Sequence, residues 1–189
     1  TNYFEMEVIG ETLDDAVGEA FDKSAKILGL PYPGGPLVDK YAQKGNPKAF
    51  PFPKPKVEGL NFSFSGLKTS ILYFIQKQLK EDPKFIEDNI EDICASIQHT
   101  IIGILMDKLK KAVKQTGIKQ IAIAGGVSAN SGIRQTLKEA ETKYHWKTFV
   151  PKFEYTTDNA AMIAIAGHYK FISEDFADMG VTAKARIKM

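Results

Sequence analysis

Three carboxylates stand where polar side chains could bind a ligand. Asp22 lies in an apolar helical pattern, and Asp39 follows the rigid sequence LPYPGGP of residues 30–36. Asp158 precedes the small apolar sequence AAMIAIAGHY. Carboxylates can hold hydroxyl groups, bases and metal ions without acting as nucleophiles. Each of these residues also has an ordinary interpretation as a solvent-facing or helix-capping side chain.

The histidines and the cysteine form no metal-binding motif. His99, His145 and His168 have no paired spacing, and Cys94 is the only cysteine. One aspartate cannot hold a metal by itself, so a metal site at Asp158 needs ligands from elsewhere. The sequence also lacks an HExxH motif and a nucleophile–base pattern, which argues against a protease.

The segment of residues 118–132, IKQIAIAGGVSANSG, is predicted to form a strand, a tight loop and the start of a helix. The continuously apolar residues 121–124 predict a strand covered on both faces, and the double glycine allows close approach of a ligand. Ser128 is predicted to cap a helix over 129–144. Ligands of open α/β sheets bind at such corners, although a double glycine also serves an ordinary turn.

Apolar spacing and capping residues predict further helices that would position these side chains. Thr12 is the expected N-cap of the first of them, Asp39 is expected in the first turn of the second, and Asp158 is expected to cap the last. The last helix is apolar enough to be buried, so Asp158 should point into a crevice near the double glycine if the two strand-to-helix corners are neighbours. The predicted helices cover residues 12–28, 37–43, 67–79, 91–115 and 160–171.

The remaining segments are predicted to be strands or irregular. Phe4, Met6 and Val8 alternate with glutamates in a strand pattern at the start of the chain, and residues 147–150 form a second short strand. Four prolines make residues 44–59 an irregular excursion, either a lid or a long connection.

Composition favours a cytoplasmic protein. The chain has 189 residues, 43% hydrophobic content and a formal net charge of +2, a balance that neither requires nor excludes a nucleic-acid partner. A single cysteine permits no internal disulfide, which fits a reducing compartment. No apolar run approaches membrane-spanning length, and the first residues lack the pattern of a signal peptide.

Long motifs along nearly the whole chain resemble the bacterial tRNA N6-adenosine threonylcarbamoyltransferase family, formerly classed as glycoproteases. In chain order these motifs are GETLDDAVGEAFDKSAKILGLPYPGGP, NFSFSGLKTS, IAIAGGVSAN and TTDNAAMIA. The resemblance implies a helix-rich α/β fold with short strands, of the two-lobed actin-like ATPase or sugar kinase type. Residues 1–189 would be its C-terminal portion, with a mostly helical part over about 8–117 and a strand–loop–helix nucleotide-binding core over about 118–189.

The resemblance also implies a reaction and its site residues. The family transfers the threonylcarbamoyl group from threonylcarbamoyl-AMP to the N6 amine of the adenosine adjacent to the anticodon, in tRNAs that read codons beginning with A. Matching the motifs assigns Asp22, Gly35, Asp39 and Asn130 to substrate binding. Asp158 would be one ligand of a divalent metal ion, expected to be Fe2+. The expected partners are tRNA, threonylcarbamoyl-AMP and other subunits of the modifying complex, with no membrane.

Two departures from the family pattern lead us to expect a fragment that is inactive alone. The paired-histidine metal motif and the Ser-Gly-Gly-His loop of the family's N-terminal half do not occur here. The chain also starts at Thr1, directly in a strand pattern, which suggests a cut inside a larger sheet. Two alternatives stay open: a sugar kinase or ATPase-like nucleotide-binding protein, and a non-catalytic scaffold half. Upstream sequence would identify a kinase, while the intact set of five site residues argues against a scaffold.

Overall fold

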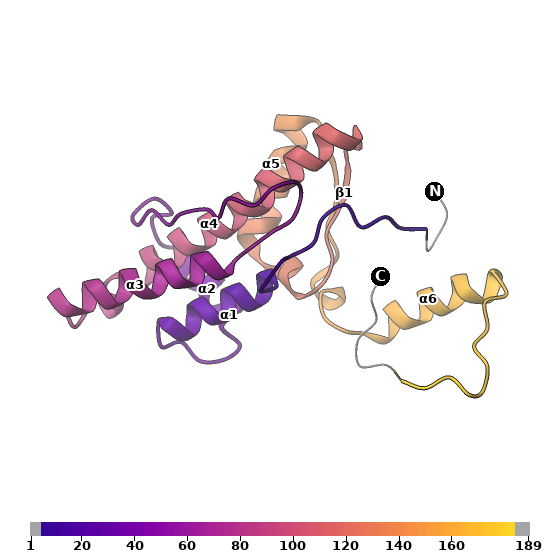
Figure 1. The fold of residues 1–189 in the computed structure, drawn as a ribbon, viewed down its shortest axis with the longest axis horizontal. Coiled ribbons are helices and arrows are strands. Elements are labelled where there is room, and N and C mark those ends of the chain that lie inside the picture. Colours follow the sequence, from indigo (N-terminus) through magenta and orange to yellow (C-terminus); the bar gives the residue numbers. More distant parts are fainter. Residues whose placement is uncertain (1–4, 184–189) are drawn as a thin grey trace.

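A computed structural model describes residues 5–183, in which helices predominate (Figure 1). In the described part, strands β1 and β2 pair in parallel, with Ile121 opposite Thr148, and α5 crosses between them. No described helix is long and apolar enough to cross a bilayer. The elements are α1 (Val17–Ile27), α2 (Gly34–Ala42), α3 (Ser65–Glu81), α4 (Phe85–Thr116), β1 (Gln120–Ala122), the 3-10 turn η1 (Gly126–Ala129), α5 (Ser131–Tyr144), β2 (Lys147–Phe149), the 3-10 turn η2 (Phe153–Tyr155) and α6 (Ala160–Ile172).

The long helix α4 belongs to two hydrophobic cores. Its N-terminal half packs with α1, α2 and α3, where Ile93, Ile97 and Ile101 follow helical spacing and are fully buried. Its C-terminal half packs with α5 and β1, where Met106 and Leu137 are buried. α4 therefore fixes α1 and α2 relative to the strand–loop–helix segment.

The proline-rich segment 44–59 is irregular, as predicted, and it packs against the helices. The ring of Phe50 lies 5.2 Å from that of Phe74, and the ring of Phe52 lies 5.4 Å from Phe74 at a nearly perpendicular angle. Such aromatic contacts stabilise a segment that forms no regular hydrogen-bond ladder. The segment is therefore a packed connection between α2 and α3.

Several predicted helix starts are wrong, and at α2 the reason is a distant contact, because Asp22 accepts hydrogen bonds from the N–H groups of Gly34 and Gly35. α1 begins at Val17 instead of Thr12, whose hydroxyl donates to Asp15 O in a preceding turn. α2 begins at Gly34, so Asp39 lies in its second turn, and α4 begins at Phe85. The predicted N-terminal strand is absent from residues 5–10, while Thr1 and Phe4 lie outside the described residues.

Strand β1 is also less covered than its apolar sequence predicted. Ile121 is buried, but Gln120 and Ala122 on either side of it are exposed. The described sheet has only two strands, so β1 is an edge strand with one covered face. The prediction of a strand covered on both faces was therefore wrong for the described residues.

Asp14 caps helix α3 from 50 residues away in the sequence. Its carboxylate accepts hydrogen bonds from the backbone N–H groups of Phe64 and Ser65 and from the hydroxyls of Ser63 and Ser65. Partial burial raises the pKa of Asp14, but these hydrogen bonds outweigh it and hold the pKa well below its usual range. The predicted helix over residues 12–28 would contain Asp14, so the sequence did not indicate this distant contact.

This cap predicts a pH-dependent loss of stability. Because the folded-state pKa lies below the unfolded value, the ionised Asp14 stabilises the fold above about pH 4, and this stabilisation is lost as the pH falls through the folded-state pKa. Asp14→Ala is expected to lower the free energy of unfolding by about 1–2 kcal/mol at pH 7, and by less in acid. Thermal unfolding at pH 7 and pH 3 measures the difference, with Asp14→Asn, which keeps one acceptor oxygen, as the control. An equal loss at both pH values would contradict the assignment.

Candidate functional site

A cavity of about 720 Å³ opens between α1–α2 and the strand–loop–helix segment. This volume falls in the range of small-molecule and cofactor sites. One wall comes from α1, the following loop and α2, and the other comes from η1, the start of α5 and the segment around η2. The lining residues are Gly18, Phe21, Asp22, Tyr32, Pro33, Gly35, Pro36, Asp39, Gly126, Val127, Ala129, Asn130, Phe153, Thr156 and Thr157.

Asp22 faces this cavity and also caps helix α2. Its Oδ1 accepts hydrogen bonds from the backbone N–H groups of Gly34 and Gly35, both at 2.9 Å. These are the first two residues of α2, whose N–H groups have no partner within the helix. Oδ2 accepts no hydrogen bond from any described residue, so Asp22 fixes the loop with one oxygen and leaves the other for a ligand.

Asp39 and Asn130 together cap helix α5. Asp39 accepts from the backbone N–H of Ser131 at 3.0 Å and from its hydroxyl at 2.7 Å, across 92 residues of sequence. Asn130 Oδ1 accepts from the N–H of Ile133 at 3.0 Å, and its Nδ2 donates to Gln98 Oε1 at 2.7 Å. Asn130, not Ser128, is therefore the N-cap of α5. Ser128 is buried and donates to Gly125 O in the preceding 3-10 turn.

The two glycines of the corner differ in structure. Gly125 has φ 77° and ψ 173°, a conformation that is essentially restricted to glycine. Gly126 has no such φ, and a Cβ built on it would meet no protein atom within 4 Å. Gly126 lines the cavity, so the space beside it is open to a ligand.

Asp158 lies beside the cavity but does not line it. The corners after β1 and β2 are neighbours, which was the condition for the predicted position of Asp158, since Gly126 and Thr157 line the same cavity. Asp158 itself is exposed, and Asn159 is the N-cap of α6, accepting from Met162 N at 3.1 Å. The prediction that Asp158 occupies this cap was wrong by one residue.

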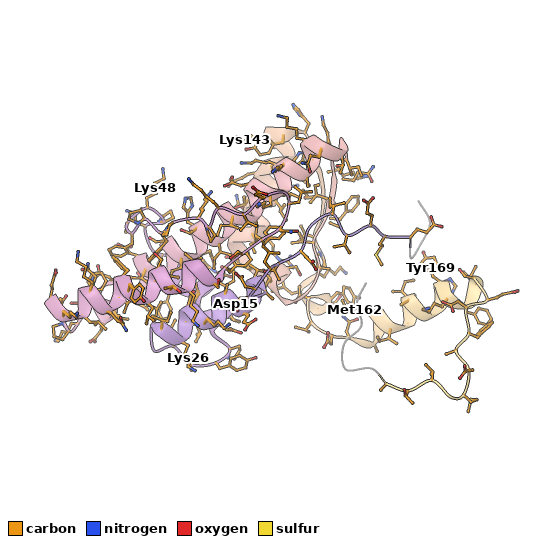
Figure 2. All side chains as sticks on the ribbon, viewed as in Figure 1. Asp15, Lys26, Lys48, Lys143, Met162 and Tyr169 are labelled. Atoms are coloured by element: carbon orange, nitrogen blue, oxygen red, sulfur yellow. The ribbon has the colours of Figure 1, made fainter. Side chains whose placement is uncertain are left out.

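Helix α6 is exposed, whereas its apolar sequence predicted burial. None of its described residues is buried, and Ile163 and Phe171 are 77% and 68% exposed. Figure 2 shows the side chains of α6, Met162 among them, on a helix that lies apart from the other helices. An apolar composition indicates that a helix can be buried, but it does not supply the element that would cover it.

Comparison with known proteins decides the family. A family model described as tRNA N6-adenosine threonylcarbamoyltransferase matches residues 1–165. The chain belongs to the tRNA N6-adenosine threonylcarbamoyltransferase family. Relatives bearing that name include proteins from Christiangramia forsetii, 77% identical over 188 residues, and Riemerella anatipestifer, 58% identical over 188 residues; each match covers 100% of this chain and 55% of the relative. A Thermotoga neapolitana relative is 43% identical over 169 residues, covering 88% of this chain and 50% of its own length. The chain thus spans about half the length of the curated relatives that it matches.

The described residues do not form a metal site by themselves. Within residues 5–183, no group of three or more His, Cys, Asp or Glu side chains is arranged to hold a metal ion. A catalytic metal usually needs about three protein ligands, and Asp158 offers one carboxylate. The described residues therefore supply at most part of a metal site.

Two aromatic residues that line the cavity were not predicted from the sequence. Tyr32 is 86% exposed and Phe153 is 64% exposed, and both line the cavity. Tyr32 lies inside the motif LPYPGGP, so an exposed aromatic residue between two prolines was a usable signal. Phe153 lies outside every motif, and no feature of the sequence set it apart from the other phenylalanines.

Proposed function

We propose that this chain forms the adenylate-binding part of a tRNA N6-adenosine threonylcarbamoyltransferase. One observation supports this most strongly: Asp22, Gly35, Asp39 and Asn130, the four residues that the motifs assign to substrate, all line one cavity. They come from α1, α2 and the N-cap of α5, and their sequence separations reach more than a hundred residues. A shared ligand accounts for their convergence.

The capping contacts leave capacity for this ligand. A carboxylate offers about four lone-pair sites, and an amide offers two lone pairs and two N–H groups. Asp22 and Asp39 can therefore accept hydrogen bonds from ribose hydroxyls while they cap α2 and α5, and Asn130 retains one N–H and one lone pair. The helix caps hold these groups in place before the ligand arrives, which reduces the entropy lost on binding.

The proposed reaction is an acyl transfer from the bound adenylate to the amine of the tRNA adenosine. The amine nitrogen of the tRNA adenosine attacks the carbamoyl carbon, the bond from that carbon to the phosphate oxygen breaks, and AMP leaves as the amine loses a proton. The residues of this chain bind and orient the adenylate, a contribution that can supply much of the rate enhancement. We propose Asp158 as one ligand of a divalent metal, expected to be Fe2+, whose other ligands would lie outside the described residues.

The remaining assignments are proposals of the same kind. We propose a two-lobed actin-like fold for the whole enzyme, with a mostly helical part over about 8–117 and a nucleotide-binding core over about 118–189. We also propose tRNA, threonylcarbamoyl-AMP and further subunits as partners, in the cytoplasm. Family membership favours this reading over a sugar kinase. The convergence of the site residues on one cavity favours it over a scaffold.

A chimera tests the proposed function. In it, this chain replaces the matching 188 residues of the Christiangramia forsetii relative, so that the segment absent from the match is present. We expect the chimera to form threonylcarbamoyladenosine on unmodified tRNA about as fast as that relative, and this chain alone to be inactive, because one carboxylate does not hold a catalytic metal. Synthetic threonylcarbamoyl-AMP serves as donor, and mass spectrometry of digested tRNA gives the yield. Turnover by the chain alone, or an inactive but folded chimera, would contradict the proposal.

A further inference from the structure

Phe153 is held in place on one face by a fixed cation. The guanidinium carbon of Arg134 lies 4.1 Å from the centre of the Phe153 ring. Arg134 is itself positioned by two hydrogen bonds, from Nε to Ser128 O at 2.6 Å and from Nη2 to Pro151 O at 2.7 Å. The guanidinium thus joins η1 to the segment before η2 and stacks on the ring, a favourable arrangement for arginine.

The other face of the ring is free for a ligand in the cavity. Phe153 lines the cavity and is 64% exposed, although Arg134 covers one of its faces. A planar apolar group entering the cavity would bury this exposed surface, and aromatic rings favour offset stacking. The Phe153 ring therefore offers a surface on which a flat ring system can stack.

Polar and apolar groups divide the cavity into two kinds of wall. Asp22, Asp39 and Asn130 offer hydrogen bonds that suit a sugar, whereas Phe153 offers a ring face that suits a nucleobase. We propose that Phe153, braced by Arg134, is a positioning residue that stacks on the purine base of the bound nucleotide. This inference rests on the proposed function. Because every base has a ring face, the contact contributes affinity and does not select adenine over guanine.

Titration of AMP into the chimera and its variants tests the inference. Base–aromatic stacking of the usual strength predicts that Phe153→Ala weakens AMP binding by roughly 5- to 150-fold. Phe153→Trp and Phe153→Tyr should bind AMP about as tightly as the parent chimera. Phe153→Leu, which keeps apolar bulk without an aromatic ring, should bind AMP as weakly as Phe153→Ala. Phe153→Ala should also weaken GMP binding, by a factor similar to that for AMP.

Phe149→Ala is the matched control. Phe149 is also an exposed phenylalanine with a cation over its ring, Lys147 Nζ at 5.3 Å, but it lies outside the cavity lining. Its loss should leave AMP affinity within about twofold of the starting protein.

Equal AMP binding by Phe153→Ala and the parent chimera would overturn the stacking role alone. A loss that Trp and Tyr fail to restore would overturn it in favour of a structural role, and a parent chimera that binds no AMP would overturn the proposed function as well.

Discussion

Gly126→Val is expected to weaken AMP binding to the chimera by roughly 10- to 100-fold while the fold stays intact. The Cβ of the added side chain fits without a clash, because a Cβ at Gly126 has nothing within 4 Å beyond its chain neighbours. It would enter the cavity that the nucleotide is proposed to occupy. Calorimetric titration of AMP measures the loss, and Gly126→Ala, with a smaller side chain, should show an intermediate one.

The neighbouring glycine provides the control for this prediction. Gly125 has φ 77° and ψ 173°, so Gly125→Val strains the backbone and should cost about 1–3 kcal/mol of stability. The two substitutions therefore separate binding from folding at adjacent positions. If Gly126→Val binds AMP like the parent chimera, the corner is only a turn, and the proposed position of the nucleotide is wrong.

Asp158→Ala should reduce transfer activity of the chimera by at least about 100-fold, since even residues that merely support metal ligands cost 10- to 100-fold. Its effect on stability should stay within about 0.5 kcal/mol, because the side chain is exposed in the structure. Metal content of the purified chimera should fall in parallel with activity. Activity is measured as threonylcarbamoyladenosine formed on tRNA, and stability by thermal unfolding.

Asn159→Ala distinguishes the metal role from a capping role. Asn159 accepts the hydrogen bond from Met162 N that begins α6, so its loss should cost about 1 kcal/mol of stability and retain most of the activity. Asp158→Ala should instead keep the stability and lose most of the activity. A chimera that keeps its activity and its metal without Asp158 would remove this residue from the proposed site.

Local patterns were sufficient for features that depend on a few neighbouring residues. The helix predicted over residues 91–115 lies within α4, whose buried face carries isoleucines at helical spacing and which ends at Gly117 with φ 72°. The prolines of 44–59 excluded a helix there, and the long motifs led to the correct family. Each of these signals is a backbone preference or a contiguous sequence, so it needs no knowledge of which elements touch.

The functions of the individual aspartates depended on contacts that no local pattern contains. Asp14, Asp22 and Asp39 cap helices α3, α2 and α5, which begin 51, 12 and 92 residues further along the chain, respectively. The same packing brings Phe153 onto Arg134 and into the cavity wall. Helix N-termini need hydrogen-bond acceptors, but the packing of one helix against another decides which distant side chain supplies them. The sequence could therefore name the ligand-binding candidates, while the cavity they share and their second role as caps came from tertiary packing alone.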